Sequence, residues 1–213
     1  MDFGQIMVDI SLMALPLILG VTLHEAGHAY AAFYLGDDTA AKAGRLSLNP
    51  LVHVDKVGTI IVPIAMKLLG APFMFGWAKP VPVNVGRLRN PRRDSIIVSI
   101  AGPSMNIVVA VLGGLLLSVI VDMGYTEKDW AFMTLVYTVY LNCLLAVLNL
   151  LPIPPLDGGH ILLGLLPYNL RQEVAKIAPF GFFIIIAILM FVPAVLMMPT
   201  MYLSGLIFSM VGL

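Results

Sequence analysis

Charge is scarce in this sequence. Only 11% of the 213 residues are charged, against about 25% in a typical soluble domain. Basic and acidic residues number 12 each, so the net charge is zero and nothing suggests a nucleic-acid partner. The single cysteine, Cys143, excludes an intrachain disulfide. A mean hydropathy of +0.97 and several long apolar runs instead predict a multi-pass protein of the cell membrane, that is, of an inner or plasma membrane.

The apolar runs predict an all-α polytopic membrane protein with one domain, 1–213. Its core consists of three transmembrane helices, at about 6–35, 95–121 and 132–151. The region 180–213 adds one or two further spans, because Pro193 and Pro199 interrupt its apolar run. We regard this region as accessory to a core that extends over about 6–167 and carries the polar motifs.

Charged loops predict how the helices are oriented. Loops 36–56 and 76–94 are basic, and the connector 122–131 is acidic. The positive-inside rule therefore places the two basic loops in the cytoplasm and the connector outside. For both basic loops to lie on the same side, residues 57–75 must form a re-entrant or short segment that does not fully cross the membrane. Small β-strand elements are expected in the 39–48 and 76–85 parts of the basic loops.

The first apolar run contains the motif HEAGH, which places His24, Glu25 and His28 within about one turn of helix. Histidines four residues apart lie on one helix face and can hold a metal ion together. A glutamate beside the first histidine can act as general base toward a water on that metal. Such patterns arise by chance in soluble helices, but polar groups at bilayer depth are costly and indicate a function. We expect one zinc ion per chain, at a peptidase site inside the membrane.

A catalytic zinc site needs a third protein ligand and an open position for water. The third ligand could come from Asp157, His160, His53 or Asp55. Asp157 is favoured because it follows the proline-broken end of the 132–151 helix. Irregular backbone is tolerated there if it lines a wet cavity. Gly158 and Gly159 also permit close approach of the backbone.

Three asparagines lie in the predicted spans, and two histidines lie near the same end. Asn106 and Asn142 are expected to form hydrogen bonds between helices, the usual role of such residues. Asn142 lies on the same helix face as Asn149 and could also support the metal ligands. His53 and His160 are further candidates for that support. A solvated loop for His53, and a helix start at the interface for His160, are the simpler interpretations.

HEAGH, together with NLLPIPPLDGG at 149–159, resembles the site-2 protease family of intramembrane zinc metalloproteases. The second motif of that family has an asparagine, a proline three residues on, and Asp-Gly eight and nine residues on. Asn149, Pro152, Asp157 and Gly158 match it in order and spacing. AGPSMN at 101–106 is similar to the middle core helix of the family, and GRLSLNPLVHVDKVGTI and GWAKPVPVN are similar to loops of its short bacterial branch.

The resemblance implies a zinc metalloendopeptidase that cuts peptide bonds in or near transmembrane segments of membrane proteins, toward the cytoplasmic side of the bilayer. It implies regulated intramembrane proteolysis or clearance of signal-peptide remnants. It also places Asn149 near the site, where an amide could hold the substrate backbone or a developing oxyanion. The alternatives are a metal-binding membrane transporter, which would not need Glu25, and a non-proteolytic membrane module.

Overall fold

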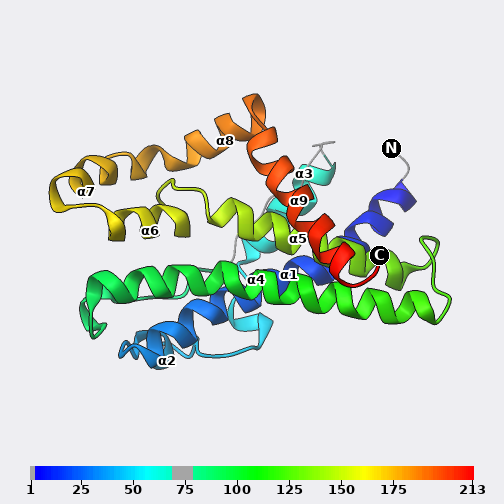
Figure 1. Cartoon of the computed structure of the whole chain (residues 1–213), viewed down its shortest axis with the longest axis horizontal. Coiled ribbons are helices and arrows are strands. Elements are labelled where there is room, and N and C mark those ends of the chain that lie inside the picture. Colours follow the sequence, from blue (N-terminus) through cyan, green and yellow to red (C-terminus); the bar gives the residue numbers. More distant parts are fainter. Residues whose placement is uncertain (1–2, 69–78) are drawn as a thin grey trace.

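A computed structural model describes residues 3–68 and 79–213, and every regular element in these ranges is helical (Figure 1). The α-helices are α1 Phe3–Tyr34, α2 Thr39–Lys42, α3 Val62–Leu68, α4 Pro91–Asp122, α5 Trp130–Asn149, α6 Asp157–Leu165, α7 Tyr168–Ala175, α8 Gly181–Phe191 and α9 Ala194–Met210. Short turns of other helical types are η1 Pro50–Val52, η2 Lys56–Ile61, η3 Val85–Arg87 and η4 Ala178–Phe180.

The described residues contain four helical stretches long and apolar enough to cross a membrane. These are Met7–Tyr34, Pro91–Asp122, Trp130–Asn149 and Tyr168–Phe191. The first three agree with the predicted core helices to within a few residues at each end. The protein is therefore a multi-pass membrane protein. Ala194–Met210 is a shorter apolar helix.

Local sequence signals explain where the core helices begin and end. The helix α4 starts with Pro91 at its first position, and the Asp94 carboxylate accepts a hydrogen bond of 2.7 Å from the Asn90 N–H. The helix α1 is followed by Gly36, whose φ of 109° is readily adopted only by glycine. The helix α5 ends at Asn149, just before the proline-rich turn that leads to α6.

The three core helices α1, α4 and α5 pack against one another, with α1 and α5 pointing the same way and α4 the opposite way. The Trp130 Nε1–H at the start of α5 donates to the Ser11 hydroxyl in the first half of α1, over 3.1 Å. At the other end, the Arg89 N–H before α4 donates to the Leu35 carbonyl just after α1, over 3.0 Å. The chain between α1 and α4 thus returns to the end of the bundle that it left.

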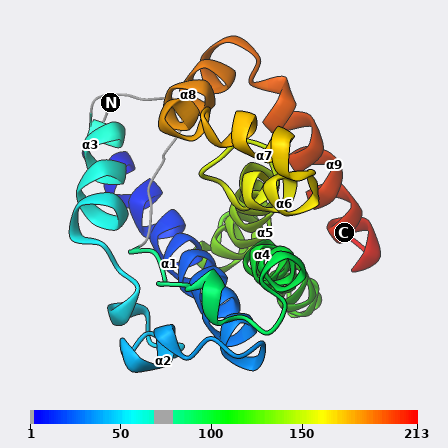
Figure 2. The same ribbon diagram turned by 90° about the vertical axis from the view of Figure 1, so that its left-hand side faces the viewer.

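The packing around this core uses small and branched side chains. Ala110, Val139, Cys143 and Ile207 form the buried contact where α9 lies against α4 and α5. Viewed along the bundle, α3 and α9 lie on opposite flanks of the core, and α6 lies beside α4 (Figure 2). Small residues at such contacts allow helices in lipid to approach closely, which is how they gain van der Waals energy.

The predicted β-strand elements are wrong over the described residues. Residues 39–42 form α2, because alanine and lysine favour helix, and 43–49 contain no strand. Residues 79–84 run extended without pairing in a ladder, because Pro80 and Pro82 have no N–H to donate. Residues 76–78 lie outside the described ranges.

The segment predicted to be re-entrant or short is helical where it is described. The elements η2 and α3 together cover Lys56–Leu68, about 20 Å of helix, which is too short to cross the hydrocarbon core alone. Residues 69–75 lie outside the described ranges, and re-entry itself stays a prediction. In the C-terminal region Pro193 separates α8 from α9 as predicted, whereas Pro199 lies inside α9 and does not end it.

Candidate metal centre

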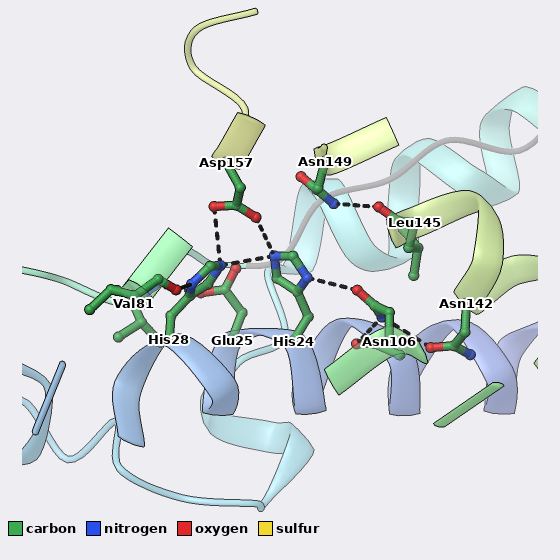
Figure 3. A network of polar contacts seen from close by, with 11 residues as sticks. His24, Glu25, His28, Val81, Asn106, Asn142, Leu145, Asn149 and Asp157 are labelled. Atoms are coloured by element: carbon green, nitrogen blue, oxygen red, sulfur yellow. Dashed lines mark hydrogen bonds and ion pairs between the residues drawn. The ribbon is translucent and has the colours of Figure 1, made fainter. Parts of the chain in front are cut away.

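Three predicted ligands meet at one point between α1 and α6 (Figure 3). The Nε2 atoms of His24 and His28 lie 3.0 Å apart. The Asp157 carboxylate faces both, with Oδ2 at 3.2 Å from the Nε2 of His24 and Oδ1 at 3.3 Å from that of His28. Both histidines are 9% exposed. The helical spacing of HEAGH and the turn before α6 therefore bring together the three residues that the sequence singled out.

The spacing of these atoms fits a tetrahedral zinc site. Ligand bonds of about 2.0–2.1 Å at tetrahedral angles put neighbouring ligand atoms about 3.4 Å apart. The two nitrogens lie 3.0 Å apart, and the two Asp157 oxygens lie 3.2 and 3.3 Å from one nitrogen each. Asp157 Oδ2 is also buried and accepts no hydrogen bond from any residue that the structure describes. A cation at the centre would satisfy it, so the donor set fits a zinc ion.

The outer nitrogens of both imidazoles are held by hydrogen bonds. His28 Nδ1 lies 2.8 Å from the Val98 carbonyl oxygen, which can only accept, so Nδ1 carries the proton. His24 Nδ1 donates to Asn106 Oδ1 over 2.7 Å. In the neutral rings both Nε2 atoms then present lone pairs toward Asp157. Two lone pairs and a carboxylate facing one another favour a metal ion between them.

A chain of amides fixes the orientation of Asn106. Asn142 Nδ2 donates to the Thr138 carbonyl over 2.9 Å, which leaves its Oδ1 to accept from Asn106 Nδ2 over 3.0 Å. Asn106 Nδ2 also donates to the Gly20 carbonyl over 3.0 Å. Both asparagines are fully buried. The expected bonding between helices is present, and Asn106 additionally aims its oxygen at His24, a role that the sequence analysis missed.

Glycines allow the elements around the site to approach. A Cβ on Gly102 of α4 would overlap His28 Nε2 and lie 2.8 Å from His24 Cε1. A Cβ on Gly158 would overlap the carbonyl oxygens of Leu150 and Leu151. The close backbone approach expected at Gly158 and Gly159 is therefore present. It allows the start of α6 to fold back toward the end of α5.

Glu25 lies beside the cluster but is not part of it. Its Oε2 accepts a hydrogen bond of 2.6 Å from the Val81 N–H in the extended segment 79–84 (Figure 3). The same segment is held by the Lys79 N–H, which donates to the His53 carbonyl over 2.9 Å. It is also held by the Asn84 N–H, which donates to Asp37 Oδ2 over 2.6 Å. Glu25 thus keeps one oxygen, Oε1, for other chemistry.

Asp37 fixes the far end of this segment. Its side chain is fully buried and also accepts hydrogen bonds from the Thr39 N–H and hydroxyl. Burial raises the pKa of Asp37, but the hydrogen bonds from Thr39 and Asn84 outweigh it and hold the pKa below its usual value. The carboxylate is therefore the form that anchors the segment over Glu25.

A cavity of about 860 Å³ opens onto the cluster. His24, Glu25, His28 and Asp157 line it, together with apolar residues from α1, α4, α5 and α6. Asn149 also lines it, and its Nδ2 donates to the Leu145 carbonyl over 2.9 Å, leaving its second N–H for a ligand. His160 lines it as an exposed residue of the first turn of α6. Asn149 and His160 thus line the cavity of the metal site but are outside the metal-ligating group found among the described residues.

His53 lies away from the cavity. The solvated-loop interpretation is wrong, because His53 is fully buried and its Nε2 lies 2.8 Å from the Ser47 carbonyl. Asp55 accepts hydrogen bonds from the N–H groups of Val57 and Gly58 and so caps η2. Neither residue belongs to the metal-ligating group that the structure shows.

Replacing Asn106 with alanine should lower the affinity for zinc by about 10–100-fold, because His24 loses the acceptor that fixes its tautomer and ring orientation. Zinc affinity is measured by competition with a chelator, and a melting curve of the zinc-free protein checks folding. Asn142→Ala is the comparison variant. It removes one of the two acceptors of Asn106 Nδ2 but keeps the Gly20 carbonyl and the contact with His24, so the loss of affinity should be smaller. Equal affinities for Asn106→Ala and the wild type would refute this role.

The fold and the site define a multi-pass membrane protein with a His–His–Asp cluster fit for a metal ion and an adjacent glutamate. The model of peptidase family M50 matches residues 118–192. The "Putative zinc metalloprotease YwhC" of Bacillus subtilis is 39% identical over 181 residues, which cover 83% of this chain and 78% of the relative. The chain therefore belongs to peptidase family M50, the site-2 protease family, and is a zinc metalloendopeptidase.

Two further relatives are longer than this chain. The "Putative zinc metalloprotease Rip2" of Mycolicibacterium smegmatis is 31% identical over 178 residues, 81% of this chain and 64% of the relative. That of Mycobacterium tuberculosis is 33% identical over 141 residues, 66% of this chain and 52% of the relative. No solved structure matches the chain.

Proposed function

We propose that this protein hydrolyses peptide bonds in or near the transmembrane segments of membrane proteins, with one zinc ion held by His24, His28 and Asp157. The observation that carries the proposal is the convergence of these three residues and Glu25 on one cavity, within or next to helices apolar enough to cross a membrane. Such a site can receive a substrate from the bilayer, which a soluble peptidase cannot.

A zinc ion bound here would supply a Lewis acid for the scissile carbonyl and would make the attacking water more acidic. Glu25 accepts the proton of that water as general base and passes it to the leaving amine. Its Oε2 is fixed by the Val81 N–H, so Oε1 is the atom that takes the proton. Asn149 uses its second N–H to hold the substrate carbonyl or the developing oxyanion, which would explain its place on the cavity wall.

The active site lies toward the cytoplasmic side in this proposal. It is built at the end of the bundle where the basic loops before and after the 57–75 segment meet, and the acidic connector lies at the opposite end. The substrates are single-span proteins whose cleavage releases a membrane-tethered factor, or signal-peptide remnants left in the bilayer. Family membership supports both roles.

Cleavage of a single-span test substrate in membranes checks the function and its sidedness together. The substrate carries a different tag at each end, and mass spectrometry maps the cut. We expect zinc-dependent cleavage in the cytoplasmic half of the apolar segment, lost on chelation and restored by zinc. A cut in the outer half would contradict the sidedness. Cleavage confined to a soluble tag, or insensitive to chelation, would contradict the function.

A further inference from the structure

Arg171 of α7 lines the same cavity as the metal cluster, and its Nε has no hydrogen-bond partner among the described residues. The residue is partly buried, and its Nε is shielded from solvent. Among the residues that the structure describes, none accepts a hydrogen bond from its side chain or forms an ion pair with it. A guanidinium carries five N–H donors and cannot lose its charge, so an unpaired one on a cavity wall favours an anionic ligand.

A second guanidinium stands on the same wall. Arg92 of α4 donates through Nε to the Gly164 carbonyl over 2.8 Å and through one terminal amino group to the carbonyls of Leu165 and Leu166 over 3.0 and 3.2 Å. These are free carbonyls at the C-terminal end of α6, where a cation is favourable. Arg92 is thus fixed in place, and it lines the same cavity as Arg171.

The cavity itself does not neutralise these two charges. Among the described residues that line it, Glu25 and Asp157 are the acidic ones. Asp157 faces the two histidines, and Glu25 is bound by the Val81 N–H. Both carboxylates therefore belong to the metal centre, and an acidic group that enters the cavity with a ligand can pair with Arg171.

We propose that Arg171, together with the charge of Arg92 on the same cavity, forms a subsite for a carboxylate of the substrate, an acidic side chain or a free C-terminus. This inference rests on the proposed function and adds the substrate class. Both arginines lie at the end of the bundle where α1 ends and α4 begins, so the carboxylate lies on the cytoplasmic flank of the substrate's apolar segment (Figure 1). An arginine fork binds a carboxylate with two parallel hydrogen bonds.

The two arginines disfavour some substrates as well as binding others. Most transmembrane segments carry lysine or arginine on their cytoplasmic flank. Such a flank would bring like charge against Arg92 and Arg171 in a partly desolvated cavity, which is unfavourable. The subsite therefore favours segments with an acidic or C-terminal flank over ordinary membrane anchors. It also disfavours signal-peptide remnants, whose n-region is basic, so of the two proposed substrate classes it selects the single-span proteins. Specificity of this kind depends on the repulsive element as much as on the attractive one.

A matched set of single-span peptides tests the subsite. The peptides differ in one residue, Asp, Asn or Lys, placed at successive positions on the cytoplasmic flank. We expect the wild type to cut the best Asp peptide about 10-fold faster than its Lys counterpart, the size of one charge-assisted hydrogen bond. Arg171→Gln should reduce this ratio, and Arg171→Glu should invert it. Arg93→Gln is the control, because Arg93 is exposed and lies outside this cavity.

The affinity of each peptide for the Glu25→Gln variant gives the same ratio without cleavage. A ratio near one at every position, in cleavage and binding, would overturn the subsite. So would an equal change in the ratio for Arg93→Gln and Arg171→Gln.

The measurements are repeated in phosphatidylcholine vesicles with and without phosphatidylglycerol. If the Asp-to-Lys ratio depended on Arg171 only in vesicles that contain phosphatidylglycerol, the site would bind a lipid phosphate and not a substrate carboxylate. Absence of zinc-dependent cleavage of the Asn peptide would instead count against the proposed function.

Discussion

Replacing Glu25 with glutamine should lower the cleavage rate by about 10²–10⁴-fold while the protein keeps its zinc, because this is the range that a general base contributes. Glu25 lies next to His24 in the sequence but outside the metal-ligating group. Glutamine retains an oxygen that can accept from the Val81 N–H, so the extended segment should stay in place. What glutamine lacks is the ability to take a proton at neutral pH.

The measurement pairs the zinc content of the purified variant with its rate on a single-span substrate. Glu127→Gln is the matched control, since Glu127 is exposed in the connector between α4 and α5 and should leave both quantities unchanged. A Glu25→Gln variant that lost zinc would make Glu25 a ligand or a structural support. A variant that kept full activity would remove it from the mechanism and would reopen the transporter interpretation.

Replacing Asp157 with alanine should release the zinc and abolish activity. The carboxylate is the one charged group of the triad, and its two oxygens face both imidazoles at 3.2 and 3.3 Å. Loss of a direct ligand should cost more than the 10–100-fold in affinity typical of a group that only supports a ligand. Alanine at this position also leaves the histidine pair without any anion to balance the metal.

Zinc bound per chain after exhaustive dialysis measures this effect. His160→Ala is the control, because His160 is a competing candidate for the third ligand and lines the same cavity, but is outside the metal-ligating group of the described residues. It should keep its zinc. If Asp157→Ala kept its zinc and His160→Ala lost it, His160 and not Asp157 would be the third ligand.

The core helices and the meeting of His24, His28 and Asp157 could both be predicted from the sequence. Long apolar runs determine helices in lipid, and the histidine spacing in HEAGH determines that both rings share a face. Asp157 was favoured because it follows the proline-broken end of α5. The charged loops independently predicted that α1 and α5 run the same way, which brings that end to the histidines. The structure confirms that parallel arrangement.

The errors arose where the signal was local and weak. Residues 39–42 were expected as strand within a basic loop, yet two alanines and a lysine favour the helical turn that forms. The buried state of His53 depends on how the loop folds against the segment at Lys79, which no periodicity encodes. The polar residues of this loop predict a solvated side chain, whereas the fold buries His53 completely.

The contacts of Asn106 and Arg171 could not be derived from sequence. Asn106 reaches His24 only because of the angle between α1 and α4, and the same residue would bond between helices at other angles. Arg171 lines the cavity although it lies on α7, the helix that follows α6. Both depend on the relative placement of helices, which is determined by packing of the whole bundle and not by a motif.

X-ray absorption at the zinc edge, on the purified wild-type protein, tests the central claim most directly. The His24–His28–Asp157 site predicts one zinc per chain surrounded by nitrogen and oxygen atoms at about 2.0–2.2 Å, with the multiple scattering of two imidazoles. The imidazole signal should fall by half when His28 alone is replaced. A sulfur neighbour at about 2.3 Å, or an imidazole signal unchanged in the His28→Ala variant, would contradict this assignment of the metal site.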